Sequence, residues 1–405
     1  MKKILSSKKL EKLPPYLFSK INKLKLEAYK KNLDVIDLSM GNPDIPPDKE
    51  IIKRLCETVL EHPKTHRYPQ AKGMPKFRNT VAEWFLKRFG VKLDPEKEVL
   101  ALIGSKEGVG HLCMAFLNSK DYTLIPDPSY PVYYNATILA GGIPYLFKIL
   151  PENGYLPDFG KIPQRIIEKA KILFLNYPNN PTTAVVEDES FLKDAIKFAK
   201  KNNLILCYDN AYSEITFDGY VAPSILQFEG AKDIAVEFHS FSKTFCMAGW
   251  RVGFVVGNEY IISQLEKFKS FIDYGVPTFI QLSAVKALLD YDRIVPEIKK
   301  LYQTRRDIMI KEFKKIGWVI EPPKGSMYLW CKLPEKITKE VGSLKFAEKL
   351  LVETGVAVAP GEGFGPNGEG YIRLALVTAN NRFHDAALRF KKVFKELGVN
   401  LKIKS

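Results

Sequence analysis

The stretch Phe238-His239-Ser240-Phe241-Ser242-Lys243, which continues through Met247-Ala248-Gly249-Trp250-Arg251-Val252-Gly253, decides how this chain is interpreted. A lysine at the end of an apolar strand, among small hydroxyls and aromatic rings, is partly desolvated, which lowers its pKa and frees its amine for imine formation. Arg251 follows eight residues later and can offer a guanidinium to a phosphate near Ser240 and Ser242. Taken alone, the pattern is unspecific, because most lysines are solvated and Arg251 equally suits a surface ion pair.

Apolar, β-rich runs lie on both sides of this stretch and alternate with segments of helical period. The predicted strands cover residues 99–103, 122–126, 143–149, 172–176, 204–208, 234–239 and 252–256. Helical patterns lie between several of them, as at 108–117 and 189–202. Continuous apolar strands that alternate with helices predict an α/β fold, a three-layer sandwich whose central sheet is mostly parallel and covered on both faces.

A chain of 405 residues exceeds the usual size of one hydrophobic core, so we expect two domains. After about residue 286 long charged helices (294–316, 344–353 and 383–397) replace the earlier alternation, and strands are expected at 326–330 and 371–376. The first forty residues contain a proline-marked arm at 13–16, a helix over 18–31 and a short strand over 34–38. We therefore predict an N-terminal arm and part of the small domain (1–49), a large domain (50–285) and a small α+β domain (286–405).

The charge and the cysteine content argue against a nucleic-acid-binding, membrane or secreted protein. The formal net charge is +15, but the 46 acidic residues are interspersed among 61 basic ones. This favours binding of anionic small molecules over nucleic acid, for which no motif is present. No apolar run reaches the length of a membrane span, and acidic and proline residues interrupt the N-terminus before a signal peptide can form. Five cysteines without a C-x-x-C pair indicate a reducing compartment, so we expect a cytoplasmic protein with no metal site.

Polar residues directly after the predicted strands are the candidates for chemistry, because ligands bind at the carboxyl ends of strands in open α/β sheets. Asp209 ends the strand 204–208, where an unpaired carboxylate is costly and a cationic partner is implied. A protonated pyridine nitrogen fits this role. A helix N-cap is the alternative for Asp209. Tyr212 lies three residues later and is either a ligand of the same ring or a packed core tyrosine.

Three further loops follow strands. Asn180 lies in Asn-Tyr-Pro-Asn-Asn-Pro-Thr-Thr, where two prolines fix the backbone and an amide can reach a ligand oxygen, although a plain turn needs no function. Ser105 and Lys106 lie between a strand and a helix, where backbone N–H groups bind anions. Tyr130, in Asp-Pro-Ser-Tyr-Pro, is suited to stacking on a flat cofactor. Together these features describe a pyridoxal phosphate site.

The chain resembles the class I/II aminotransferases, which are pyridoxal-phosphate enzymes of fold type I, and the resemblance runs from about Leu13 to the last helix. It implies that Lys243 forms the Schiff base with the cofactor and moves the proton between substrate and cofactor. It implies Asp209 on the pyridine nitrogen, Asn180 and Tyr212 on the phenolic oxygen, and Tyr130 stacked on the ring.

The same resemblance implies a phosphate-binding cup and a substrate site. The cup residues are Ser105, Lys106, Ser240, Ser242 and Arg251, with Tyr68 reaching in from a partner subunit of a homodimer. Arg373, in Tyr-Ile-Arg-Leu-Ala-Leu, resembles the arginine that binds the substrate α-carboxylate, with Gly41, Asn180 and Tyr130 beside it. The alternative for Arg373 is a surface position on an antiparallel strand. One departure is Thr183, which stands where the family frequently has glycine after Asn-Pro-Thr.

Within the family, segments such as Gly-Ser-Lys-Glu-Gly and Met-Ala-Gly-Trp-Arg-Val-Gly-Phe are most similar to bacterial glutamate–pyruvate (alanine) aminotransferases. We therefore expect transamination between L-alanine and 2-oxoglutarate. LL-Diaminopimelate and aspartate aminotransferases are the near alternatives. Two rivals are a lyase or cyclopropane-forming synthase on the same scaffold, and the aminotransferase-like domain of a transcription regulator. The regulator is disfavoured because about forty residues before the core leave no room for a winged helix and linker.

Overall fold

The structure is a computed structural model that describes residues 5–14 and 17–401. Seven strands form its central sheet, in the order β2-β8-β7-β6-β5-β3-β4. Their bounds are β2 (Val99–Leu102), β3 (Tyr122–Asp127), β4 (Ile143–Lys148), β5 (Ala170–Leu175), β6 (Ile205–Asp209), β7 (Ala235–Ser240) and β8 (Gly253–Gly257). Strand β8 runs antiparallel to its neighbours β2 and β7, and the other neighbouring strands are parallel. The predicted, mostly parallel sheet is confirmed.

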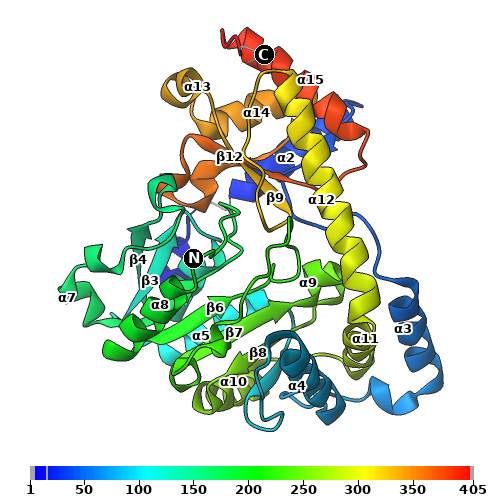
Figure 1. Cartoon of the computed structure of the whole chain (residues 1–405), viewed down its shortest axis with the longest axis vertical. Helices are drawn as coiled ribbons and strands as arrows, with labels where there is room; N and C mark the ends of the chain where they lie inside the picture. The colour runs from blue at the N-terminus through cyan, green and yellow to red at the C-terminus, as the bar shows by residue number, and fades with distance from the viewer. Residues whose placement is uncertain (1–4, 15–16, 402–405) are drawn as a thin grey trace.

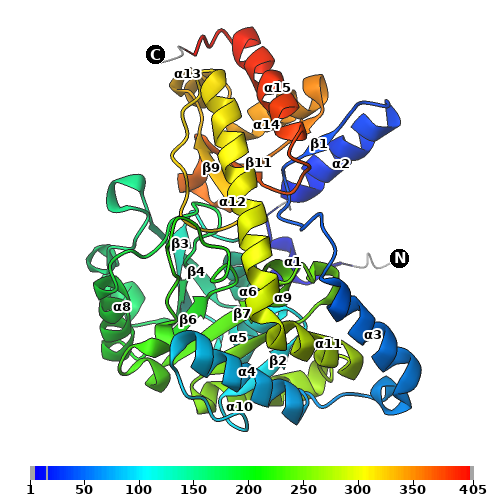
Figure 2. The same ribbon diagram turned by 45° about the vertical axis from the view of Figure 1, so that its right-hand side comes forward.

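Helices cover both faces of this sheet (Figures 1 and 2). One face packs against α5 (Ser105–Phe116), α6 (Val132–Ala140) and α10 (Glu259–Ile272). The core on the other face includes residues of α4 (Pro75–Phe89), α8 (Ser190–Lys201) and α11 (Thr278–Leu289). Strands β2, β5 and β7 are almost wholly buried, which explains why they are continuous apolar runs rather than alternating ones. The result is the expected three-layer sandwich.

A smaller α+β unit stands above the sheet in Figure 1. Its antiparallel sheet has the order β11-β12-β9, formed by β9 (Tyr328–Lys332), β11 (Ala359–Pro360) and β12 (Tyr371–Ala375). Strand β1 (Ile36–Asp37) pairs in parallel with β10 (Val356–Ala357). An N-terminal segment of the chain therefore packs in the same unit as the C-terminal segments. The helices of this unit are α2 (Leu17–Lys30), α12 (Tyr291–Lys315), α13 (Glu335–Glu340), α14 (Ser343–Thr354) and α15 (Arg382–Glu396). The exact domain boundaries stay a prediction.

Several elements differ in extent from the expectation. Helix α12 begins at Tyr291 rather than at Ile294, and Pro296 lies inside it, in the second turn. The strand expected over 34–38 is reduced to the two residues of β1. Sequence patterns did not single out α3 (Lys49–Glu61), α4 or α11, nor the short α1 (Lys8–Glu11) and α7 (Gln164–Ile167). Pro15 and Tyr16 of the proline-marked arm lie outside the described residues.

The fold brings the carboxyl ends of several strands to one edge of the sheet. Strand β2 is parallel to β7 because both are antiparallel to β8, so β2, β5, β6 and β7 all end at this edge. The polar residues that follow these strands therefore come together. Among the described residues, no helix combines the length and the apolar character that crossing a bilayer requires.

We predict that Leu206→Ala lowers the free energy of unfolding by about 2–5 kcal/mol, because the Leu206 side chain on β6 lies fully buried in the core and its removal leaves a cavity. The matched substitution Leu388→Ala, on the half-exposed face of α15, should change it by less than about 0.5 kcal/mol. Urea denaturation of both variants measures the difference. Equal midpoints would contradict the placement of β6 in the core.

Candidate active site

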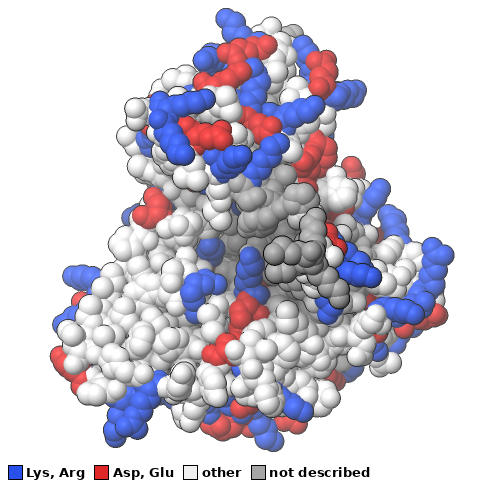
Figure 3. All heavy atoms as spheres, turned by 180° about the vertical axis from the view of Figure 1, so that it is seen from behind, with Lys and Arg blue, Asp and Glu red and all other residues white. Residues whose placement is uncertain are grey.

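The strand ends frame a cavity of about 140 Å³. It is lined by Ser105, Lys106, Tyr130, Asn176, Asn180, Asp209, Ala211, Tyr212, Ser240, Ser242, Lys243 and Arg251. Ten of these residues were proposed from the sequence, and Asn176 and Ala211 are additions. Gly41, Arg373 and Tyr68 were also proposed but are not among the lining residues. Figure 3 shows the face opposite to Figure 1, which is hollowed below the small α+β unit, with lysine and arginine side chains in the hollow.

Lys243 lies on the short helix α9 (Phe241–Thr244), directly after β7. Its ammonium donates a hydrogen bond to the carbonyl oxygen of Gly41, across more than two hundred residues of chain. Burial lowers the pKa of Lys243; the hydroxyl of Tyr328 opposes this, and the positive charges of Arg373 and Arg251 add to it. A lysine with a lowered pKa is deprotonated, and hence nucleophilic, at a lower pH than an exposed lysine.

Asp209 ends β6 at the floor of the cavity, and no helix begins there, so the N-cap alternative is wrong. The hydroxyl of Tyr133 donates to its Oδ2 at 2.8 Å. The other oxygen, Oδ1, is buried and has no hydrogen-bond partner. Burial raises the pKa of Asp209, against the hydrogen bond from Tyr133. A buried carboxylate oxygen without a donor leaves a place for a cationic N–H group, so the site fits the protonated ring nitrogen of pyridoxal phosphate.

Another part of the cavity wall is suited to binding an anion. Helix α5 begins at Ser105, and its N-cap Gly104 has a φ of 79°, in the left-handed region that favours glycine. A Cβ on Gly104 would lie 2.5 Å from Nη2 of Arg251, so the missing side chain lets the guanidinium approach the helix start. Arg251 also donates to the carbonyl of Ala248. Backbone N–H groups at a helix start together with a guanidinium form a phosphate site.

The loop after β5 is held by its own side chains. The amide of Asn176 donates to the carbonyl of Asp209 at 2.6 Å, and its oxygen accepts from the backbone N–H of Asn180 at 2.8 Å. Thr183, which replaces the frequent glycine, has a φ of 62°. The turn therefore keeps the left-handed conformation that glycine favours, at a cost of about 1 kcal/mol for a side chain there. Asn180 remains in the cavity wall despite this departure.

Arg373 lies on β12 and is buried, so the alternative of a surface arginine is wrong. Its guanidinium lies between two aromatic rings, 4.0 Å from the centre of Tyr328 and 4.6 Å from that of Phe364. It donates to Oδ1 of Asn180 at 2.7 Å and to the carbonyl of Ser39 at 3.0 Å. These contacts fix the guanidinium next to the cavity, where it is suited to binding a carboxylate.

Tyr68 does not reach this cavity from its own chain. Its side chain is 88% exposed, and its ring lies 5.4 Å from that of Tyr274. Phe271 and Ile272, which come shortly before Tyr274 in the sequence, are also largely exposed. The position of Tyr68 is that of a residue available to another copy of the chain.

Besides Ala211, three residues near the site were not proposed from the sequence. Tyr133 lies one helical turn after Tyr130, and that spacing was the available signal. Asn176 stands directly after β5 in the quoted Asn-Tyr-Pro-Asn-Asn stretch, where its place at the strand end was the signal. Tyr328 comes from β9 of the small unit and no local pattern marks it.

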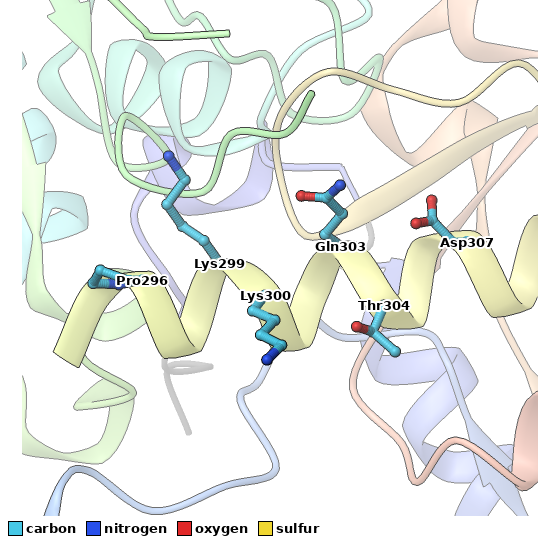
Figure 4. A pocket seen from close by; sticks show the side chains of 6 residues that line it. All are labelled: Pro296, Lys299, Lys300, Gln303, Thr304 and Asp307. Atoms are coloured by element: carbon cyan, nitrogen blue, oxygen red, sulfur yellow. The ribbon is translucent and has the colours of Figure 1, made fainter. Parts of the chain in front are cut away.

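Two other places in the described residues carry clustered polar side chains, but neither is arranged to bind a ligand. A wider depression runs along α12, where Lys299 and Gln303 point to one side of the helix and Lys300 and Thr304 to the other (Figure 4). The second is Glu107, His111 and Asp273, whose potential ligand atoms lie within 4.8 Å of one another. The buried ammonium of Lys269 donates to both of these carboxylates, so a cationic group of the chain already occupies the place of a metal ion there.

The chain is similar to known aminotransferases over almost its whole length. The family model of "Aminotransferase class I and II" matches residues 33–385. The chain is 48% identical to LL-diaminopimelate aminotransferase of Dehalococcoides mccartyi, over 93% of this chain and 95% of that protein. It is 43% identical to the enzyme of the same name from Moorella thermoacetica, over 96% and 98%. The substrate-bound structure of BacF from Bacillus subtilis superimposes with a TM-score of 0.92 at 36% identity, over 96% and 98% of the two chains.

We predict that Lys243 reacts with acetic anhydride, in the cofactor-free protein, with a pH midpoint below the value of about 10.4 for an unperturbed lysine. The reason is that burial disfavours its charged form. Competitive labelling over a pH series, with the peptide containing Lys243 quantified by mass spectrometry, measures the midpoint. Free Nα-acetyl-lysine in the same tube is the reference. A midpoint equal to or above that of the reference would contradict the desolvated environment.

Proposed function

The chain belongs to the class I and II aminotransferase family, and we propose that it transfers the amino group of LL-diaminopimelate to a 2-oxo acid. Members of this family are pyridoxal-phosphate-dependent transaminases that act on amino and 2-oxo acids. The names of relatives up to 48% identical over nearly the whole chain support the proposed donor. They do not support the expected similarity to alanine aminotransferases, so LL-diaminopimelate replaces L-alanine as the proposed amino donor.

One observation carries the proposed mechanism: an amine with a lowered pKa and a buried carboxylate with one unpartnered oxygen lie in the wall of the same cavity. Bound pyridoxal phosphate supplies an electron sink for the bond to the substrate α-carbon. Asp209 holds the ring nitrogen protonated, because its buried carboxylate needs a cationic partner. The amine of Lys243 would hold the cofactor and would take and return the proton at the substrate α-carbon.

The remaining residues of the proposed site bind and orient. The start of α5, with Ser105 and Lys106, holds the phosphate together with Ser240 and Arg251. Ser242, adjacent to Lys243, completes this wall, and Tyr130 stacks on the ring. Asn180 and Tyr212 hold the ring oxygen. Arg373 pairs with the α-carboxylate beside Gly41, and its hydrogen bonds to Asn180 and Ser39 hold the guanidinium in one orientation.

We also propose that the active unit is a homodimer in which Tyr68 reaches the phosphate of the partner subunit. The exposure of Tyr68 next to Phe271, Ile272 and Tyr274 supports this arrangement, since clustered exposed aromatic and aliphatic side chains mark interfaces.

To test the amino donor, the loaded protein is mixed with one amino acid at a time: LL-diaminopimelate, L-alanine, L-glutamate or L-aspartate. We predict that LL-diaminopimelate bleaches the visible absorption of the bound cofactor at the lowest concentration, and that 2-oxoglutarate or pyruvate restores it. Restoration by a 2-oxo acid separates a transaminase from a lyase or synthase on the same scaffold. If L-alanine acts at lower concentration than LL-diaminopimelate, the proposed donor is wrong and the mechanism stands.

The dimer is tested by subunit complementation. We predict that Tyr68→Phe weakens cofactor binding about 10- to 100-fold, because a hydrogen bond to a charged group is lost. Mixing this variant with inactive Lys243→Ala subunits should restore one intact site per mixed dimer, since Lys243 and Tyr68 then come from different chains. Activity after refolding the mixture, compared with each variant refolded alone, is the measurement. An absence of recovery would show that Tyr68 acts within its own chain or not at all.

A further inference from the structure

Tyr328 does not line the cavity but contacts two residues of the proposed site. It lies on β9 of the small unit and is buried, whereas Tyr212 and Lys243 come from the large sheet. Its hydroxyl lies 3.1 Å from that of Tyr212. The guanidinium of Arg373 covers its ring at 4.0 Å. The tyrosine therefore touches both the residue proposed for the cofactor oxygen and the residue proposed for the substrate carboxylate.

Gly41 places the same hydroxyl close to Lys243. A Cβ on Gly41 would lie 1.9 Å from the Tyr328 hydroxyl oxygen, so the missing side chain makes room for it. The carbonyl of Gly41 accepts the hydrogen bond from the Lys243 ammonium. One phenol thus packs against the backbone segment that holds the reactive amine.

Either hydroxyl can be the donor in the contact between the two tyrosines, which lies entirely within the protein. A hydroxyl has only one proton to give. Tyr212 is proposed to hold the ring oxygen of the bound cofactor, and it does so by donating that proton. In the loaded enzyme Tyr328 must therefore be the donor in the contact between the two phenols, and the Tyr212 oxygen is the acceptor.

We propose that Tyr328 is a positioning residue: by donating to Tyr212 it directs the Tyr212 proton toward the ring oxygen of the bound cofactor. This inference rests on the proposed function. A hydrogen bond to that oxygen withdraws negative charge and lowers the proton affinity of the nitrogen that joins Lys243 to the cofactor. Because Tyr328 also lies under Arg373, the arrangement links the substrate carboxylate site to the electronic state of the cofactor.

The test uses the loaded enzyme and compares Tyr328→Phe with the wild type. The expected result is that the pH midpoint of the visible absorption band rises by about one unit, because Tyr212 loses the contact that orients its proton. We expect kcat to fall about tenfold with a smaller change in KM. The matched control is Tyr302→Phe, which removes another buried hydroxyl, one without a hydrogen-bond partner, and should leave the midpoint and kcat unchanged.

A double-mutant comparison separates positioning from packing. If Tyr328 acts through Tyr212, the variant with both Tyr212→Phe and Tyr328→Phe has the spectral midpoint of Tyr212→Phe alone. Additive shifts, or an unchanged midpoint in Tyr328→Phe, overturn the proposal. A wild-type protein that binds pyridoxal phosphate without a visible band, or whose band no amino acid bleaches, overturns the proposed function instead, so the two failures are distinguishable.

Discussion

The rest of the site depends on one constraint, which is that the buried carboxylate of Asp209 requires a cationic partner. It lies at the end of a strand whose neighbours are apolar, and only one of its two oxygens has a donor. An uncompensated charge at such a place costs several kcal/mol in effective terms, so the fold retains it only at the expense of stability unless a cation occupies the site. The ring nitrogen of pyridoxal phosphate is a cation of the right kind. Pairing of this cation with the Asp209 carboxylate would favour tight binding of the cofactor in one orientation.

The second constraint is that the site is shared between the two parts of the chain. Arg373 on β12 donates to Asn180 of the large sheet, and the backbone N–H of Ser129 donates to the carbonyl of Phe364 at 2.8 Å. The side chain of Asn367 reaches the buried carboxylate of Asp127, which lies three residues before Tyr130. These contacts surround the proposed substrate site from both sides. A carboxylate bound at Arg373 is therefore held at the junction of the two parts, next to the cofactor.

The sequence predicts the large sheet well because its strands are buried on both faces and are therefore continuous apolar runs. Lys243, Asp209 and Asn180 could be predicted from the sequence for the same reason, since each closely follows such an apolar run. Helices α3, α4 and α11 were not singled out, and strands as short as β1 and β10 have no periodicity to detect. Tyr328 could not be inferred, because its role arises only when β9 meets β6 and α9 in space. The choice of amino donor likewise depends on pocket shape, and the names of the similar proteins contain a different donor from the one that short motifs suggested.

The central claim is that Lys243, rather than another lysine of the cavity wall, carries the cofactor. Reduction of the loaded enzyme with borohydride fixes pyridoxal phosphate to the lysine that holds it, and peptide mass spectrometry identifies that residue. The account predicts the added mass on the peptide that contains Lys243, with stoichiometric labelling and loss of activity. Labelling at Lys106, which also lines the cavity, with Lys243 unmodified, would contradict it.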